Sequence, residues 1–171
     1  MVLVRAGRSP DAARLASLAA RTFEETFGPL NHPEDMARYL TGAYGVAKQA
    51  AELADPAMAT LLAEADGSLA GYAQLRDGPA PPCVVGPRPV ELQRLYVDGP
   101  WQGRGVAQIL IRAAMDEAGR RNAATLWLGV WERNARAQAF YRKCGFVDVG
   151  SQPFALGSAR QTDRIMVRAL P

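Results

Sequence analysis

The first feature of the chain that suggests chemistry is a group of glycines at the point where a helix is expected to begin. Residues 98–110 read DGPWQGRGVAQIL, so Gly103 and Gly105 stand directly before an apolar helical pattern that starts at Val106. A helix N-terminus carries open backbone amides and the positive end of the helix dipole. Without side chains in the way, this turn can present its N–H groups to an anion such as a pyrophosphate. A tight turn that binds no ligand would use the same glycines, so both interpretations stay open.

Two common nucleotide-binding motifs do not fit this stretch. A Walker-type loop needs Gly-Lys followed by Ser or Thr at its end, and the stretch has none. A dinucleotide fingerprint needs a third Gly or Ala three residues after the second, where this chain has Gln108. Neither motif therefore accounts for the glycines of this turn.

The strand that leads into the turn has an irregular pattern. In VELQRLYV, residues 90–97, the apolar alternation shifts by one position between Leu92 and Leu95. A β-bulge produces such a shift and frees backbone groups from the strand ladder. Groups freed near residues 95–97 could pair with an amide-bearing ligand. Alternatively, Tyr96 simply shares an interior face, and the pattern does not decide between the two.

Regular elements must position these residues, and the first half of the chain predicts helices followed by a hairpin. A strand at residues 2–6 is followed by a helix to about Glu24, because Ser9-Pro10-Asp11 supplies a cap, a first-turn proline and an acid. A second helix begins near residues 31–35, and a further helical stretch runs to Asp55. Residues 58–76 form two apolar runs about Asp66-Gly67, which is typical of a hairpin.

The second half predicts a crossover and another hairpin. After a proline-rich loop at 77–89 come a strand at 90–97, a helix to about Asn122, a buried strand TLWLGVW at 125–131, a helix at 135–143 and two strands at 146–156 and 159–170. The stripe expected to be buried on the first of these helices comprises Val106, Ile109, Leu110, Ala113 and Ala114. Strand, helix and strand across 90–131 require parallel strands, whereas the hairpins are antiparallel. The prediction is a mixed, twisted α/β sheet of six or seven strands.

Composition restricts the class of protein. The chain has 171 residues, 49% of them hydrophobic and 22% charged, which predicts one globular domain over residues 1–171. The net charge of +3 is not clustered, so neither a nucleic acid nor a membrane surface is expected as partner. We expect no signal peptide and a cytoplasmic protein. Cys83, Cys144 and the lone His32 do not form a metal-binding pattern, so no metal is expected.

Two motifs together resemble a known family. The pattern LxRLYVxxxWQGRGVAxxLI, with Gln102-x-x-Gly105-x-Ala107, looks like the acetyl-CoA-binding motif of the GNAT superfamily of N-acetyltransferases. The second motif follows strand 125–131 and comprises Asn134-x-x-Ala137-x-x-Phe140-Tyr141-x-x-x-Gly145-Phe146. The order of elements is also that of the family, so the resemblance covers essentially the whole chain. The segments RTFEETFG and PFALGSARQTDRIM additionally resemble the branch of bacterial spermine/spermidine acetyltransferases.

The resemblance implies a fold, a cofactor and its binding residues. The two central parallel strands would splay, acetyl-CoA would lie in the gap between them, and helices would cover both faces of the sheet. Backbone groups of Leu95 and Val97 would bind the pantetheine arm, and the amides of residues 102–108 the pyrophosphate. The residues implied in cofactor binding are Leu95, Tyr96, Val97, Gln102, Gly103, Arg104, Gly105, Val106, Ala107, Gln108, Asn134 and Tyr141.

The resemblance also implies direct attack of an amine on the thioester. Tyr141 matches the position of the family's general acid, which protonates the leaving thiolate, and the N–H of Val97 would stabilise the oxyanion. Glu91 matches a position where many relatives carry a glutamate that acts as base. A carboxylate on the strand face that pairs with an arginine is the other interpretation of Glu91.

The amine acceptor is the part of the function that the sequence determines least. The early helices of the family wall the acceptor site, so the candidates for substrate binding are Phe23, Glu24, Phe27 and Glu91. We expect a small-molecule primary amine, with a polyamine as one version that would need an acidic pocket built by Glu24, Glu25, Glu34 and Asp35. A protein N-terminus, an antibiotic amine, or a non-catalytic acyl-CoA sensor are the alternatives. A homodimer is also compatible with the family.

Overall fold

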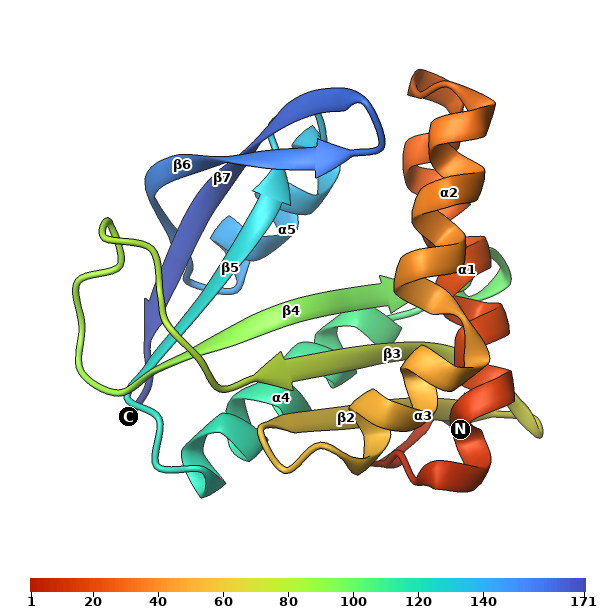
Figure 1. Cartoon of the computed structure of the whole chain (residues 1–171). Coiled ribbons are helices and arrows are strands. Elements are labelled where there is room, and N and C mark those ends of the chain that lie inside the picture. Colours follow the sequence, from red (N-terminus) through yellow and green to blue (C-terminus); the bar gives the residue numbers. More distant parts are fainter.

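The computed structural model describes residues 1–171 and contains a single seven-stranded sheet in the order β1-β2-β3-β4-β5-β7-β6 (Figure 1). The β4–β5 pair is parallel and every other neighbouring pair is antiparallel. The mixed sheet predicted from the sequence is therefore confirmed. The strands are β1 (Leu3–Ala6), β2 (Met58–Ala65), β3 (Ser68–Arg76), β4 (Pro89–Val97), β5 (Thr125–Trp131), β6 (Val147–Leu156) and β7 (Ala159–Ala169).

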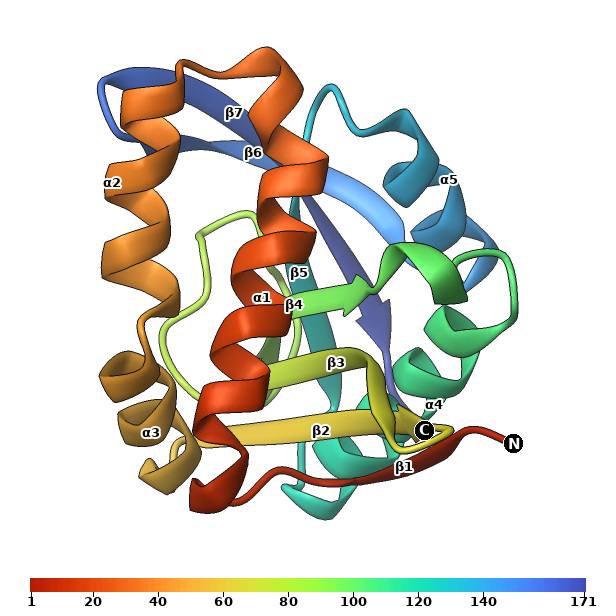
Figure 2. The ribbon, with the colours of Figure 1, turned by 90° about the vertical axis from the view of Figure 1, so that its right-hand side faces the viewer.

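Helices cover both faces of this sheet. Figure 2 shows α1 and α3 on one side of β2, β3 and β4, and α4 on the other side. The helix α2 packs beside α1, while α5 lies behind β5 in the view of Figure 1. None of these helices combines the length and the apolar character that a membrane-spanning segment needs. Their bounds are α1 (Ala12–Phe27), α2 (Pro33–Tyr44), α3 (Val46–Ala54), α4 (Val106–Arg120) and α5 (Ala135–Lys143).

Two cores follow from the alternation of side chains along the strands. On β2, Leu61 and Ala63 belong to the core under α4, whereas Leu62 points to the opposite core under α1 and α2. Both faces of the central strands are thus buried, which explains why β3 and β5 are almost continuously apolar.

The buried face of α4 differs from the predicted stripe, because Ile109 is exposed and Ala113 is only partly buried. Ile109 is 38% exposed, whereas Ile111 is 2% exposed and packs against the sheet. The remaining contact comes from Val106, Leu110, Ala114 and Ala118, which follow a spacing of four residues. The sequence offered two isoleucines close together, and only the direction from which the sheet approaches the helix decides which one is buried.

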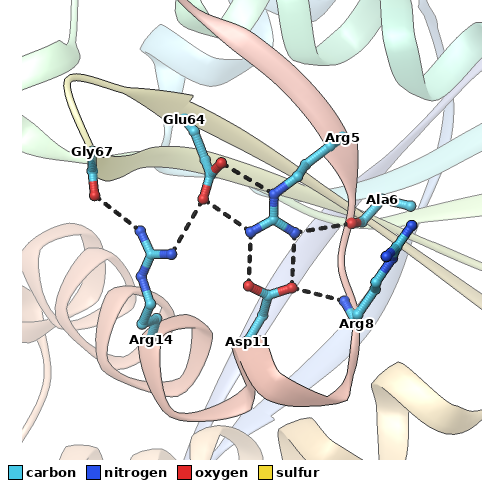
Figure 3. Close-up of polar contacts among 7 residues, drawn as sticks. All are labelled: Arg5, Ala6, Arg8, Asp11, Arg14, Glu64 and Gly67. Atoms are coloured by element: carbon cyan, nitrogen blue, oxygen red, sulfur yellow. Dashed lines mark hydrogen bonds and ion pairs between the residues drawn. The ribbon is translucent and has the colours of Figure 1, made fainter.

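The first strand is fastened by a network of charged side chains around Arg5 (Figure 3). Its guanidinium donates two hydrogen bonds to Asp11, of 2.8 and 2.7 Å, and two to Glu64, of 3.1 and 2.9 Å. Asp11 is the residue directly before α1, and Glu64 lies on β2. One arginine therefore ties the edge strand β1 to its neighbour in the sheet and to the start of α1.

Candidate active site

The two parallel strands separate soon after they begin, and this opens the centre of the sheet. β4 and β5 pair only from Pro89 to Glu91, opposite Thr125 to Trp127. Beyond this point the two arrows diverge in Figure 1. The second half of β4 therefore keeps β3 as its only partner, and its other edge is available to a ligand.

A β-bulge orients the free edge of β4. Gln74 on β3 pairs with Arg94 and Leu75 pairs with Leu92, so Gln93 is the extra residue. The shift predicted between Leu92 and Leu95 is confirmed. The bulge exchanges the faces to which the following side chains point, which places Tyr96 toward α1 and leaves Leu95 toward the core under α4.

The hydrogen-bond ladder shows where the backbone groups of residues 95 and 97 point. The N–H of Asp98 donates to the carbonyl of Ala70 at 3.0 Å. In an antiparallel ladder, bonded and non-bonded pairs alternate, so Tyr96 is bonded to β3 and its neighbours Leu95 and Val97 are not. Their N–H and C=O groups face the opening. In agreement, the carbonyl of Val97 accepts a hydrogen bond of 3.2 Å from the side chain of Gln102 rather than from β3.

The glycines of the turn have the backbone conformation for which glycine is needed. Gly103 has a φ of +75° and Gly105, which caps α4, has a φ of +82°. A Cβ at either position would meet nothing within 4 Å, so the space in front of the helix is open. The first helical hydrogen bond runs from Ile109 to Gly105, and no side chain caps the preceding amides. The N–H groups of residues 106–108 are therefore available to an anion.

A cavity of about 660 Å³ joins this helix end to the free edge of β4. It is lined by eleven of the twelve residues predicted to bind the cofactor, which are Leu95, Tyr96, Val97, Gln102, Gly103, Gly105, Val106, Ala107, Gln108, Asn134 and Tyr141. Arg104 is the exception, because its guanidinium lies over the ring of Trp101, 5.5 Å from the ring centre. The structure thus gives Arg104 a surface cation–π contact and does not place it in the cavity.

Two basic residues of α5 line the same cavity and were not singled out from the sequence. Arg136 donates to the side-chain oxygen of Gln102 at 3.0 Å, and Lys143 lies about two turns further along the same face of the helix. Arginine and lysine at a helix surface carry no local signal for an anion site. Only the packing of α5 beside the start of α4 brings their charges to the cavity.

A second cavity of about 280 Å³ adjoins the first on the side of α1 and α2. Aromatic rings make up much of its wall, namely Phe23, Phe27, Tyr39, Tyr44, Tyr96, Trp131, Phe154 and Tyr141. Phe23 and Phe27, predicted to bind substrate, are both in this wall. Five residues line both cavities, and these are Leu95, Tyr96, Asn134, Ala137 and Tyr141. The two cavities therefore meet around the side chain of Tyr141.

Tyr141 and Asn134 are held by the geometry of α5. The side chain of Asn134 accepts a hydrogen bond of 3.1 Å from the N–H of Ala137, as expected for a helix cap. Tyr141 lies two turns later on the inner face, is 8% exposed, and contacts the rings of Phe140 and Phe146. Burial raises the pKa of Tyr141 above its usual value, so the phenol stays protonated and can donate a proton.

Of the two carboxylates predicted to bind substrate, Glu91 lines the aromatic cavity and Glu24 does not. Glu91 lines the second cavity, where it forms an ion pair of 2.7 Å with Arg76, so the interpretation as a paired carboxylate on the strand is realised. Glu24 is exposed on α1 and lines neither cavity, which removes it from the substrate-binding set. Glu24 follows Phe23 directly, and a rotation of about 100° per residue along the helix places its side chain on the exposed surface of α1.

The acidic group expected for a polyamine site does not assemble. Glu34 is exposed, and Asp35 accepts hydrogen bonds from the backbone and side chain of Ser158, of 3.1 and 2.8 Å. Glu25 lines the larger cavity and not the aromatic one. Of the four acids named from the sequence, none reaches the aromatic cavity.

One carboxylate in the aromatic cavity was missed by the sequence analysis. Asp163 lies on β7 opposite Trp131 and lines this cavity. No hydrogen bond or ion pair involves its side chain, and burial together with the nearby charge of Glu132 raises its pKa to about 6. The segment PFALGSARQTDRIM resembles a family branch, but nothing in it marks Asp163 as a residue of the cavity. Its position depends on the β5–β7 register, which only the assembled sheet defines.

Comparison with known proteins agrees with this geometry. Residues 14–146 match the model of the acetyltransferase (GNAT) family. An N-acetyltransferase of Mycobacterium tuberculosis (strain ATCC 25618 / H37Rv), itself uncharacterized, is 39% identical over 160 residues, which cover 94% of this chain and 98% of that protein.

Solved structures share the fold. The PaiA N-acetyltransferase of Thermoplasma acidophilum, in complex with coenzyme A, has a TM-score of 0.79 at 20% identity and covers 99% of both chains. An acetyltransferase of Salmonella typhimurium, solved with its cofactor acetyl-CoA, has a TM-score of 0.72 at 21% identity and covers 100% of this chain and 95% of that one. The protein described here therefore belongs to the GNAT family of acetyl-CoA-dependent N-acetyltransferases.

Proposed function

We propose that this enzyme transfers the acetyl group of acetyl-CoA to the primary amine of a small molecule held in the aromatic cavity. The observation that carries the proposal is the meeting of the two cavities at Tyr141. A cofactor bound along β4 and α4 would bring its thioester to this junction, where an amine in the second cavity could attack it directly.

The residues of the larger cavity fit acetyl-CoA as the donor. The amides of residues 106–108 and the left-handed glycines before them suit a pyrophosphate, and the free edge of β4 suits the amide groups of a pantetheine arm. Arg136 and Lys143 add positive charge at the same cavity. When bound, acetyl-CoA supplies the thioester carbonyl that the amine attacks.

Two groups at the junction fit the chemistry of attack and departure. The N–H of Val97 faces the opening and is oriented to donate to the carbonyl oxygen as negative charge develops on it. Tyr141, protonated because it is buried, donates its proton to the departing thiolate. Glu91 and Asp163 are the carboxylates that line the aromatic cavity, so they are the candidates to accept a proton from the amine.

The acceptor that fits the second cavity is a compact amine with an aromatic or apolar body. A volume of about 280 Å³ and a wall of aromatic rings favour such a molecule. A polyamine requires several spaced carboxylates along its length, and Glu24, Glu34 and Asp35 do not line the cavity. The polyamine version of the proposal therefore has the weaker support.

A thiol-release assay with acetyl-CoA tests the proposal. The amine panel contains 2-phenylethylamine and tyramine as expected acceptors, spermidine and an aminoglycoside as alternatives, and a short peptide with a free N-terminus. We expect the highest kcat/KM with the arylalkyl amines. Preference for the peptide or spermidine would contradict the proposed acceptor. Calorimetric binding of acetyl-CoA without turnover of any amine would instead support an acyl-CoA sensor.

A further inference from the structure

In the aromatic cavity, where the acceptor is proposed to bind, some polar side chains have partners and others have none. Arg76 is paired with Glu91 at 2.7 Å, and Arg94 is paired with Glu52 at 2.6 Å. Both arginines are therefore neutralised by carboxylates of the protein itself. The cavity offers no unpaired cation among its charged side chains.

Two hydrogen-bond acceptors in the same cavity lack partners. The side chain of Asp163 makes no hydrogen bond or ion pair, and the buried Oε1 of Gln93 has no donor within reach. A ligand that brings its own donors suits the half-buried carboxylate of Asp163 and the buried Oε1 of Gln93. An ammonium group carries up to three N–H donors and one positive charge, so it complements acceptors of this kind.

The sheet leaves room for the carboxylate of Asp163. A Cβ added to Gly129, on the neighbouring strand β5, would stand 3.1 Å from Oδ2 of Asp163. Any larger residue at position 129 would push the carboxylate aside. Gly129 also lines the cavity, so β5 is open where the carboxylate faces the acceptor space.

We infer that Asp163 is the residue that binds the ammonium group of the acceptor and removes its proton, with Gln93 as a second hydrogen-bond acceptor. This inference rests on the proposed function and adds the residue that selects a cationic amine. One N–H bond of the ammonium breaks, its proton moves to the carboxylate, and the nitrogen keeps the electron pair that forms the amide bond. The thioester C–S bond breaks as the amide C–N bond forms, and the leaving sulfur takes the proton of Tyr141. The second proton, lost by the nitrogen after attack, restores the phenol of Tyr141, and the first leaves Asp163 to solvent.

The charges around Asp163 set the pH at which this can occur. Glu132, which follows β5, raises the pKa of Asp163 in addition to burial. The cavity also presents Arg76 and Glu91 as one neutral pair, Arg94 neutralised by Glu52, and protonated Tyr39 and Tyr44 from α2. Asp163 is ionised above about pH 6, so the rate should rise as the pH passes upward through that value.

The test compares kcat/KM of the wild type and Asp163→Asn between pH 5 and 9 with 2-phenylethylamine. We expect Asp163→Asn to lose about 100-fold or more of kcat/KM at pH 7.5. The acid limb of its pH–rate profile, which is the rise in rate near pH 6, should disappear. With phenylhydrazine, which is mostly neutral at pH 7.5, the loss should be clearly smaller, because no proton has to be removed first. A purely structural role would reduce both rates equally. An unchanged limb in Asp163→Asn would overturn the inference.

Three variants serve as controls. Glu132→Gln removes a negative charge near Asp163 and should move the limb to lower pH. Asp116→Asn is the same chemical change on the exposed surface of α4 and should leave the profile as it is. Glu91→Gln should retain the acid limb of the pH–rate profile near pH 6. If that limb disappeared in Glu91→Gln, the base would be Glu91.

A binding measurement separates this inference from the proposed function. Calorimetry of 2-phenylethylamine with the protein saturated by coenzyme A should give at least a tenfold weaker Kd for Asp163→Asn than for the wild type. If the wild type acetylates no amine but binds this one through Asp163, the proposed function fails and the site stands. Equal amine affinity in the two proteins, with acetyl-CoA affinity intact, would reject Asp163.

Discussion

Tyr141 is the residue on which the proposed reaction depends most directly. It lies at the junction of the two cavities and its pKa is raised by burial, so the phenol remains protonated even at alkaline pH. Its ring packs against Phe140 and Phe146. The hydroxyl can therefore be removed without disturbing the packing of the ring.

Substitution of Tyr141 by Phe should reduce kcat by about 10²- to 10⁴-fold, the usual contribution of a general acid. The affinity for acetyl-CoA should change little, because the ring stays in place; calorimetry measures the affinity and the thiol-release assay measures kcat. Tyr72→Phe is the matched control, since Tyr72 is fully buried, lines neither cavity and has a hydroxyl without a hydrogen-bond partner. Full turnover by Tyr141→Phe would remove this residue from the acid role.

Asp163 illustrates how stability and function oppose each other at a single residue. Its pKa is raised above the ordinary value of 3.8 to about 6, first by burial and then by Glu132. The ionised form therefore destabilises the folded state, and this cost is absent at low pH and complete above pH 6. We expect Asp163→Asn to raise the melting temperature at pH 8 by more than at pH 4.5, as measured by differential scanning fluorimetry. A lower melting temperature at pH 8 would contradict the burial cost.

At the scale of elements, the start of α4 combines a backbone requirement with an open binding surface. Gly105 and the hairpin residue Gly67 have similar φ values of +82° and +77°, and neither would meet an obstacle if a Cβ were added. Any non-glycine residue costs about 1–2 kcal/mol in this conformation. The two positions therefore differ in their distance from the cavity and not in their strain.

This pair separates ligand contact from folding. Gly105→Ala and Gly67→Ala should lower the free energy of unfolding by similar amounts, measured by urea denaturation. Gly105→Ala should also weaken acetyl-CoA binding by at least about tenfold, or 1.4 kcal/mol, because the side chain enters the space in front of the helix amides. Equal acetyl-CoA affinity in both variants would show that this turn does not hold the pyrophosphate.

The edge strand β1 depends on the network around Arg5, shown in Figure 3. The hydrogen bonds from Arg5 lower the pKa of Asp11 to about 2 from its ordinary value of 3.8. A depressed pKa stabilises the fold fully above 3.8, and this contribution is lost as the pH falls through about 2. β1 and the start of α1 should therefore lose this stabilisation only at strongly acidic pH, as the pH approaches 2.

Asp11→Asn should cost about 1–2 kcal/mol at pH 7, because the charged hydrogen bonds are lost at a partly solvated site. The difference from the wild type should vanish near pH 2 when urea denaturation is repeated there. Arg14→Gln, which breaks an exposed pair of 3.2 Å with Glu64, is the comparison and should cost less than about 1 kcal/mol. If Asp11→Asn lowered the free energy of unfolding equally at both pH values, the charge of Asp11 would not contribute to stability.

At the scale of the whole molecule, the opening between β4 and β5 divides the sheet into two parts. β1 to β4 with α4 lie on one side, and β5 to β7 with α5 lie on the other. The strands on the two sides pair only over three residues each. A ligand that contacts both α4 and α5 would join the two parts where the sheet does not.

Acetyl-CoA should therefore stabilise the whole fold. At 100 times its Kd it should add about 2.7 kcal/mol, which corresponds to a rise of roughly 5–10 °C in Tm for a chain of this size. Scanning fluorimetry measures the rise, and hydrogen exchange should show new protection at residues 95–97 and 105–108. Gly105→Val is the control that should show little rise. Protection confined to one side of the opening would contradict the bridging role.

Much of this arrangement could be predicted from the sequence, because the signals are local. The hairpin at Asp66-Gly67, the cap at Asn134 and the bulge before Leu95 each depend on a few neighbouring residues, and the structure contains all three. The family motifs located the start of α4 and Tyr141. These features require only the conformational preferences of the chain and the periodicity of its apolar residues.

Only the tertiary structure decided which side chains line the aromatic cavity. Glu24 and Glu91 were both candidates from the sequence, yet one is exposed and the other is paired with Arg76, while Asp163 arrives from the last strand. The physical reason is that charges are placed by strand register and helix rotation, which involve residues far apart in the chain. The sequence by itself determined the fold, the family and the glycine turn before α4, and the assembled sheet determined which side chains surround the aromatic cavity.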